Sequence, residues 1–161
     1  MVFRRHHEKP GALLAFDRIL LPLSGDEVDG PALKLASMLL TAHPGEASLL
    51  HVIEVPFDRQ LDMQDDASLA RAEGILRGAE QFLEGQKIAV RTSTVQARAA
   101  GAAIVDDANE FNADLILMGL RYKKRFGGQW DAGRTVPYVM RNSTAPVWCL
   151  RAQTKELAQT P

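Results

Sequence analysis

The chain has 161 residues, a hydrophobic fraction of 46% and a formal net charge of -1 at pH 7. This length is typical of one domain with a sizeable core, and the near-neutral charge argues against a general nucleic-acid binder, which normally carries a broad basic surface. No apolar run approaches the roughly 20 residues of a membrane-spanning helix, so we expect a soluble, cytoplasmic protein without membrane insertion.

The chain ends and the cysteine content constrain the protein further. Residues 1–15 begin with the polar, unpatterned MVFRRHHEKP, and we expect a mobile arm there, a folded domain over 16–151 and a tail over 152–161. Cys149 is the single cysteine, which excludes an intramolecular disulfide. No CxxC, HExxH or GxSxG spacing indicates a metal site or a hydrolase nucleophile.

Apolar runs and amphipathic segments alternate through the first half of the chain. Arg18 to Leu23 (RILLPL) ends in a cluster of turn residues and predicts a buried strand. Ala32 to Thr41 places its alanines and leucines on one helical face, and Ser48 to Val55 predicts a second strand. After an irregular polar stretch, Ala67 to Gly85 predicts an amphipathic helix closed by glycine.

The same alternation continues to the end of the chain. Ile88 to Val95 predicts an edge or half-covered strand, and Ala99 to Phe111 predicts a helix. The stretch 114–150 then predicts a strand ending at Gly119, a basic loop (RYKKRFGGQWDAG), a helix (RTVPYVMRNS) and a last strand (APVWCL).

Five strands alternating with four helices favour an α/β fold, a single doubly wound, Rossmann-type five-stranded parallel sheet with helices on both faces. Ligands of such sheets bind beyond the carboxyl ends of the strands. We therefore expect function at the loop that follows Gly119.

Four segments carry a family resemblance: FDRILLPLSGDE, LLHVIEV, AAIVDDANEFNADLILMG and GRTVPYVMRNSTAPVWCL. Taken together, over Phe16 to Arg151, they resemble the universal stress protein family. The resemblance implies a flavodoxin-like sheet and a non-catalytic regulatory role in the stress response. It also implies a homodimer formed through the last strand, where an edge invites pairing; the expected interface residues are Val147, Trp148, Cys149 and Leu150.

The family divides into members that hold ATP and members that do not. Its ATP pattern is Gly-x-x-Gly, nine residues, then Gly-Ser or Gly-Thr. Gly119 matches the first of these glycines, and Gly133 matches the last with a spacing that is one residue longer than the pattern. Tyr122 stands where the second glycine is expected, and Arg134 stands where a hydroxyl is expected. Ser24 replaces the aspartate that follows the first strand. The resemblance therefore implies that ATP is not bound in the standard family manner.

Basic residues gather at the same edge of the predicted sheet, and Arg98 takes the place of another family glycine. The candidate ligand-binding residues are Ser24, Gly25, Arg98, Gly119, Arg121, Lys123, Lys124, Gly127, Gly128, Gly133, Arg134 and Thr135. Arginine forks and exposed backbone N–H groups suit a phosphate-containing ligand such as ATP, AMP or cyclic AMP. Two alternatives stay open: a nucleotide-sensing module akin to the universal-stress-like domains of transporters, or a solvated loop whose cations pair with Asp26, Glu27 and Asp131.

Enzymatic constellations are weak. SGDEVD is similar to the pyrophosphate loop of adenylating ATP pyrophosphatases, but Asp26 and Glu27 would repel a pyrophosphate. His51 lies within a strand pattern and Cys149 lies beside Trp148, where a satisfied histidine and a buried thiol are expected. We therefore predict no catalytic residue, no metal site and no certain cofactor, leaving weak ATP hydrolysis open.

Overall fold

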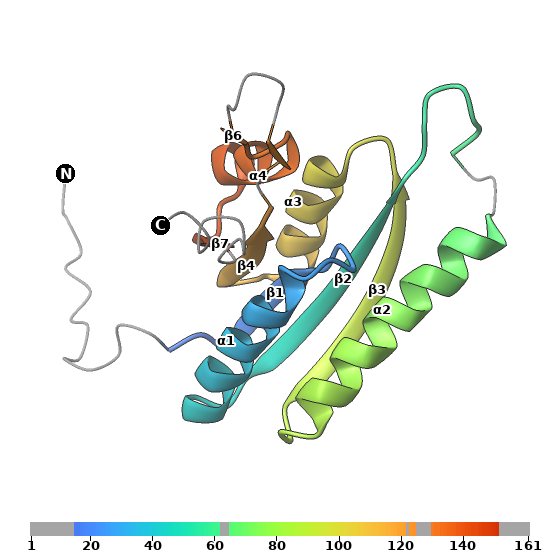
Figure 1. Ribbon diagram of the computed structural model, residues 1–161. Coiled ribbons are helices and arrows are strands. Elements are labelled where there is room, and N and C mark those ends of the chain that lie inside the picture. The colour runs from blue at the N-terminus through green and yellow to red at the C-terminus, as the bar shows by residue number, and fades with distance from the viewer. Residues whose placement is uncertain (1–14, 62–64, 122, 125–129, 152–161) are drawn as a thin grey trace, which may run out of the picture.

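The computed structural model describes residues 15–61, 65–121, 123–124 and 130–151 (Figure 1). The elements are β1 (Arg18–Pro22), α1 (Asp29–Ala42), β2 (Glu46–Glu54), α2 (Asp66–Glu84), β3 (Ala89–Ala97), α3 (Ala100–Phe111), β4 (Leu115–Leu120), β5 (Lys123–Lys124), β6 (Trp130–Asp131), α4 (Thr135–Asn142) and β7 (Val147–Arg151). The main sheet has five strands in the order β3-β2-β1-β4-β7, and all its pairings are parallel. This confirms the predicted doubly wound α/β sheet and its Rossmann-type order.

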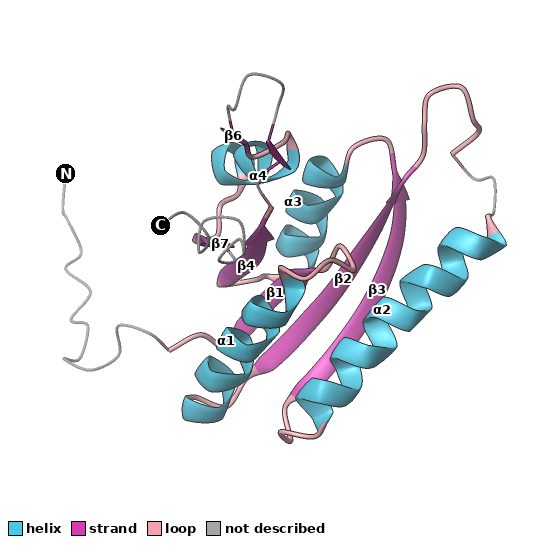
Figure 2. Ribbon diagram, viewed as in Figure 1, coloured by secondary structure: helices cyan, strands magenta, loops and turns pink. Residues whose placement is uncertain are grey.

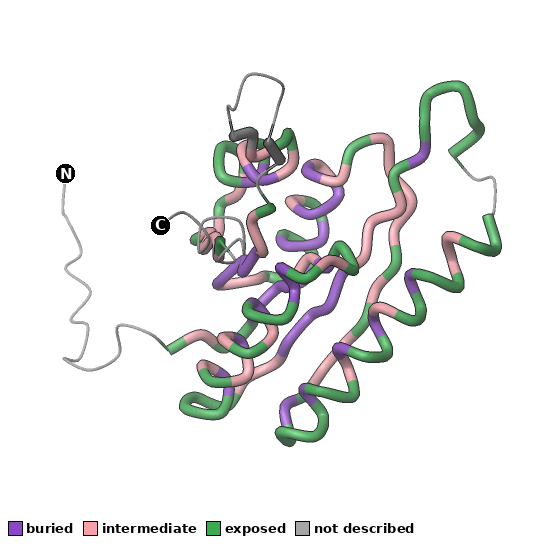
Figure 3. The backbone as a smooth tube through the Cα atoms, in the orientation of Figure 1, coloured by how far each residue is buried: buried purple, intermediate pink, exposed green. Residues whose placement is uncertain are grey.

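Each face of the sheet has its own apolar core, because side chains alternate along every buried strand. In β1, the fully buried Ile19 and Leu21 pack with α1 and α2, whereas Leu20 packs with α3 and α4. Figure 2 shows the two helix pairs on opposite sides of the strands, and Figure 3 shows burial concentrated in the central strands. The apolar runs of the sequence thus have the two-sided burial expected of a parallel sheet.

Two local features differ from the sequence prediction. Helix α1 begins at Asp29 rather than at Ala32, because Pro31 is tolerated in a first helical turn where no backbone N–H donor is needed. The basic segment predicted as a loop contains the short antiparallel strands β5 and β6, whose backbones pair Lys123 with Asp131 and Lys124 with Trp130.

The two outer strands of the main sheet are β3 and β7, as predicted. Along β7, Trp148 and Leu150 pack against the α1 and α2 side, whereas Val147 and Cys149 pack against the α3 and α4 side. The Trp148 ring meets the Phe16 ring edge to face, with 5.3 Å between their centroids. Strand β7 is therefore anchored on both faces, and no strand among the described residues pairs with its outer edge in the main sheet.

A polar network lies beneath α3, on an otherwise apolar face. Arg91 Nε donates to the fully buried Ser48 Oγ (2.8 Å), and Arg91 Nη2 donates to Asp107 Oδ2 (3.3 Å). The Arg91 guanidinium also lies 4.2 Å from the centroid of the Phe111 ring. Burial raises the pKa of the Asp107 carboxyl, and the Arg91 charge opposes this effect. The arginine satisfies both buried polar side chains, which would otherwise be costly.

Replacing Asp107 by Asn should remove a pH-dependent contribution to the free energy of unfolding. Because folding raises the pKa of Asp107 above its ordinary value of 3.8, its stabilising contribution is complete below that pH and is lost as pH rises through the folded-state pKa. The free energy of unfolding of the wild type minus that of Asp107→Asn, from urea titrations, should fall with rising pH and then level off. Asp106→Asn, an exposed neighbour on α3, controls for the lost charge. A difference that rises with pH would contradict this assignment.

Candidate functional site

A cleft opens between the carboxyl ends of β1 and β4, which are adjacent strands whose following helices α1 and α4 cover opposite faces. Such a switch point is where α/β sheets bind ligands. The cleft has a volume of about 220 Å³. Its walls are mainly apolar, and the lining residues include Leu23, Leu50, Val52, Ile104, Met118 and Val136. Four of the predicted site residues also line it: Ser24, Gly119, Arg121 and Thr135.

The floor of this cleft includes a carboxylate that the sequence analysis missed. Asp29 is 8% exposed, and its carboxylate accepts hydrogen bonds from Gly25 N (2.7 Å), Ser24 N (3.0 Å) and Ser24 Oγ (3.2 Å). Burial raises the pKa of Asp29, and the hydrogen bonds from Gly25 and Ser24 oppose that shift. The N–H groups of Ser24 and Gly25 therefore already have a hydrogen-bond acceptor and are not free for an incoming anion. The sequence signal that could have revealed this contact is an acidic residue in the first turn of a helix.

The two glycines beside the cleft have packing reasons of their own. Gly25 has φ +81°, and a Cβ there would lie 2.5 Å from Ile75 Cδ1 of α2, so this residue faces α2. A Cβ on Gly119 would lie 2.7 Å from the backbone oxygen of Val28. Gly119 thus allows β4 to approach the segment that enters α1.

Arg121, the first cation after β4, forms an ion pair. Its Nη1 lies 2.7 Å from Asp26 Oδ2, and both residues line the cleft. This is the contact expected if the cations of the basic segment pair with nearby carboxylates. Within the described residues, the cleft therefore combines apolar walls with two carboxylates and one paired arginine.

A second hollow, the outer groove, lies beside the cleft and shares Ala100 and Thr135 with it. The outer groove has a volume of about 820 Å³ and is lined by Glu54, Val55, Pro56, Phe57, Arg98, Ala99, Ala100, Gly101, Arg134, Thr135 and Tyr138. Arg98 Nη1 donates to the backbone oxygens of Val55 (3.1 Å) and Pro56, and the guanidinium lies 5.4 Å from the centroid of the Phe57 ring.

The predicted site residues are thus divided between two hollows. Arg98 and Arg134 line the outer groove, and Thr135 lines both spaces. Gly133 has φ +73° and precedes the N-cap of α4. Lys123 and Lys124 form β5, whereas Gly127 and Gly128 lie outside the described residues.

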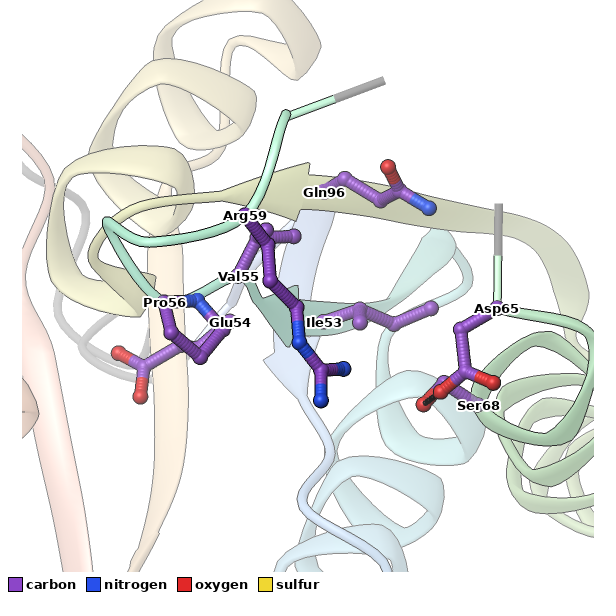
Figure 4. Close-up of a pocket in the computed structure, with 8 residues that line it drawn as sticks. All are labelled: Ile53, Glu54, Val55, Pro56, Arg59, Asp65, Ser68 and Gln96. Atoms are coloured by element: carbon purple, nitrogen blue, oxygen red, sulfur yellow. Dashed lines mark hydrogen bonds between the residues drawn. The ribbon is translucent and has the colours of Figure 1, made fainter. Parts of the chain in front are cut away.

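Figure 4 shows a third hollow, between the end of β2 and the start of α2. Its volume is about 170 Å³, and it contains none of the predicted site residues. Ser68 Oγ donates to the Asp65 carboxylate, and this hydrogen bond lowers the pKa of Asp65. The Glu54 carboxylate points away from Arg59, Asp65 and Ser68 in this view, and Glu54 Oε1 accepts the N–H of Ala100 at the start of α3 (2.8 Å).

The residues considered for catalysis, His51 and Cys149, have contacts or burial that suit a structural role. His51 Nδ1 lies 2.8 Å from the Leu23 backbone oxygen, and burial raises the pKa of the Cys149 thiol, which disfavours the reactive thiolate. Among the described residues, no group of histidine, cysteine, aspartate and glutamate side chains could hold a metal ion. No described helix is both long and apolar enough to cross a membrane.

Comparison with known proteins identifies the family. The model of the universal stress protein family matches residues 15–151. The chain belongs to this family. Universal stress protein Sll1654 from Synechocystis sp. is 30% identical over 112 residues, which cover 69% of this chain and 71% of the relative. The resemblance seen in the sequence is confirmed.

Solved structures of universal stress proteins share the fold. One, from Archaeoglobus fulgidus in complex with dAMP, has a TM-score of 0.67 at 17% identity, covering 83% of this chain and 96% of that chain. Another, in complex with cAMP, has a TM-score of 0.65 at 19% identity, covering 85% of this chain and 98% of that chain. At 17% and 19% identity, these similarities establish a shared fold.

Gly119→Ala should lower the free energy of unfolding by about 1–3 kcal/mol, because the new Cβ would overlap a backbone oxygen that cannot move aside cheaply. Urea unfolding measures this change. Gly78→Ala is the matched control, since Gly78 lies inside α2 with open space at its Cβ position. Alanine there should stabilise the protein by about 0.5–1 kcal/mol. Equal effects at both positions would contradict a packing role for Gly119.

Proposed function

We propose that this universal stress protein is a cytoplasmic, non-catalytic regulator that binds a nucleotide or another phosphate-containing ligand without the family's ATP cradle. The observation that carries this proposal is the departure from the ATP pattern, with Tyr122 in place of a glycine and Arg134 in place of a hydroxyl residue. At the turn after β1, the Asp29 carboxylate already accepts the N–H groups of Ser24 and Gly25. The pairing of Arg121 with Asp26 adds to it, because the arginine charge is already compensated.

Charge at the cleft disfavours a triphosphate there. Asp26 and Asp29 both line this space and Arg121 is the one described cation there, so the carboxylates repel the phosphates of an incoming nucleotide. A neutral heterocycle suits the apolar walls much better, since small-ligand sites are typically apolar with a few polar groups. The cleft therefore favours the base of a nucleotide over its phosphates.

Two relatives support a nucleotide as the ligand class. Universal stress proteins of the same fold have been solved with dAMP and with cAMP. ATP, AMP and cyclic AMP are accordingly the candidate ligands of this chain. A regulatory role is the function that the family resemblance implies, and no group of described residues could hold a metal ion for catalysis.

Calorimetry at low salt tests this function with ATP, AMP and cyclic AMP. We expect at least one of them to bind, and we expect ATP to bind no more than about tenfold tighter than AMP, because Tyr122 and Arg134 replace residues of the family's ATP pattern. Incubation with ATP should yield no ADP, AMP or pyrophosphate. Absence of heat and of a thermal shift with all three ligands would reject the binding function. If ATP bound a hundredfold tighter than AMP, the proposal that the family's ATP cradle is missing would be rejected.

We also propose that the protein is a homodimer formed through β7. This strand is at the edge of the main sheet, and Val147, Trp148, Cys149 and Leu150 are each only partly buried. Unpaired strand edges with apolar side chains readily add a strand from another chain. A second copy that pairs along β7 would cover these four side chains.

Trp148→Asp should convert the dimer to a monomer at micromolar concentration, because the interface would gain a charge without a partner. Light scattering measures the mass. Phe16→Ala is the control, since it removes the ring that contacts Trp148 inside one chain but leaves the outer edge of β7 unchanged. Urea unfolding of both variants verifies that they are folded. A monomeric wild type, or a dimer that survives Trp148→Asp, would contradict the proposal.

A further inference from the structure

The cleft is too small to enclose a nucleotide alone. Its volume of about 220 Å³ is below the range of about 300–1,000 Å³ that is typical of small-molecule sites. The outer groove, at about 820 Å³, lies within that range. Ala100 and Thr135 line both spaces, so a ligand seated in the cleft can continue past these residues into the outer groove.

The two spaces differ in charge. The cleft contains Asp26 and Asp29, and its arginine is paired. The outer groove contains Arg98 and Arg134, and no carboxylate among the described residues forms an ion pair with either arginine. The carboxylate that lines the outer groove, Glu54, accepts the Ala100 N–H at the start of α3. An anion is therefore favoured in the outer groove and disfavoured in the cleft.

The outer groove is also held in shape. The backbone oxygens of Val55 and Pro56 hold the Arg98 guanidinium beside the Phe57 ring. A Cβ on Gly101 would lie 2.8 Å from the Tyr138 ring, so Gly101 allows this ring to lie against α3. Phe57 is 86% exposed and Tyr138 is 43% exposed, which leaves ring surface that a ligand can cover. A preorganised arginine loses less freedom when it binds an anion.

We propose that a nucleotide places its heterocycle in the cleft and its phosphate in the outer groove at Arg98 and Arg134, rather than at the segment that follows Gly119. This inference rests on the proposed function and specifies the direction in which the ligand lies. Thr135 lines both spaces, so its hydroxyl is available to the part of the nucleotide that joins base and phosphate. The apolar walls bind the base, and the two arginines bind the charge.

Calorimetry with adenosine and AMP at low salt tests this direction. In the wild type, AMP should bind about tenfold tighter than adenosine, because only AMP carries the phosphate. Arg134→Ala should reduce AMP affinity to that of adenosine and leave adenosine affinity unchanged, whereas Arg134→Lys should retain part of the preference. Arg121→Ala, at the cleft, should leave the preference intact. Arg141→Ala, near the other end of α4, is the matched surface control.

The outcomes separate this inference from the proposed function. Loss of the AMP preference in Arg121→Ala but not in Arg134→Ala would overturn the direction while nucleotide binding stands. Equal affinity of the wild type for adenosine and AMP would overturn it as well. If neither compound binds and the other nucleotides also fail, the proposed function falls and this inference falls with it.

Discussion

The carboxylate of Asp29 is the contact on which the site depends. It joins the turn after β1 to the first turn of α1 by accepting hydrogen bonds from Ser24 and Gly25. Because the carboxylate is buried, these donors offset part of the cost of its desolvation, which still raises its pKa. The same contact engages the N–H groups of Ser24 and Gly25, so these two groups are not free to bind an anion. One internal charge therefore stabilises the local fold and adds a carboxylate to the lining of the cleft.

The distribution of charge around the carboxyl edge of the sheet follows from that contact. Asp26 and Arg121 compensate each other beside the cleft, while Arg98 and Arg134 line the neighbouring groove. A nucleotide with its base among apolar side chains and its phosphate beside the arginines satisfies both environments. The family fold is thus retained while the position of the phosphate is proposed to change, and the edge of β7 is the separate surface proposed for a second copy.

Sequence reasoning recovered the order of strands and helices because strands of a parallel sheet are buried on both faces and therefore form continuous apolar runs such as RILLPL. It proposed one site of twelve residues at the carboxyl edge of the sheet, and four of them, Ser24, Gly119, Arg121 and Thr135, line the cleft in the structure. It did not find β5 and β6, whose two-residue ladder has no apolar pattern. Nor did it assign a role to Asp29, because a hydrogen bond to a turn depends on distances that residue spacing does not specify.

The sequence by itself determined the fold class, the family and the loss of the ATP pattern at Tyr122 and Arg134, because periodicity and motif spacing are properties of the chain alone. Only the tertiary structure decided which charges are compensated. Arg121 and Asp26 are 95 positions apart, and Arg98, which follows β3, donates to the backbone oxygen of Val55, which follows β2. Those contacts form only because the strand ends lie side by side at one edge of the folded sheet. They pair the arginine of the cleft with a carboxylate and leave the arginines of the outer groove without one among the described residues.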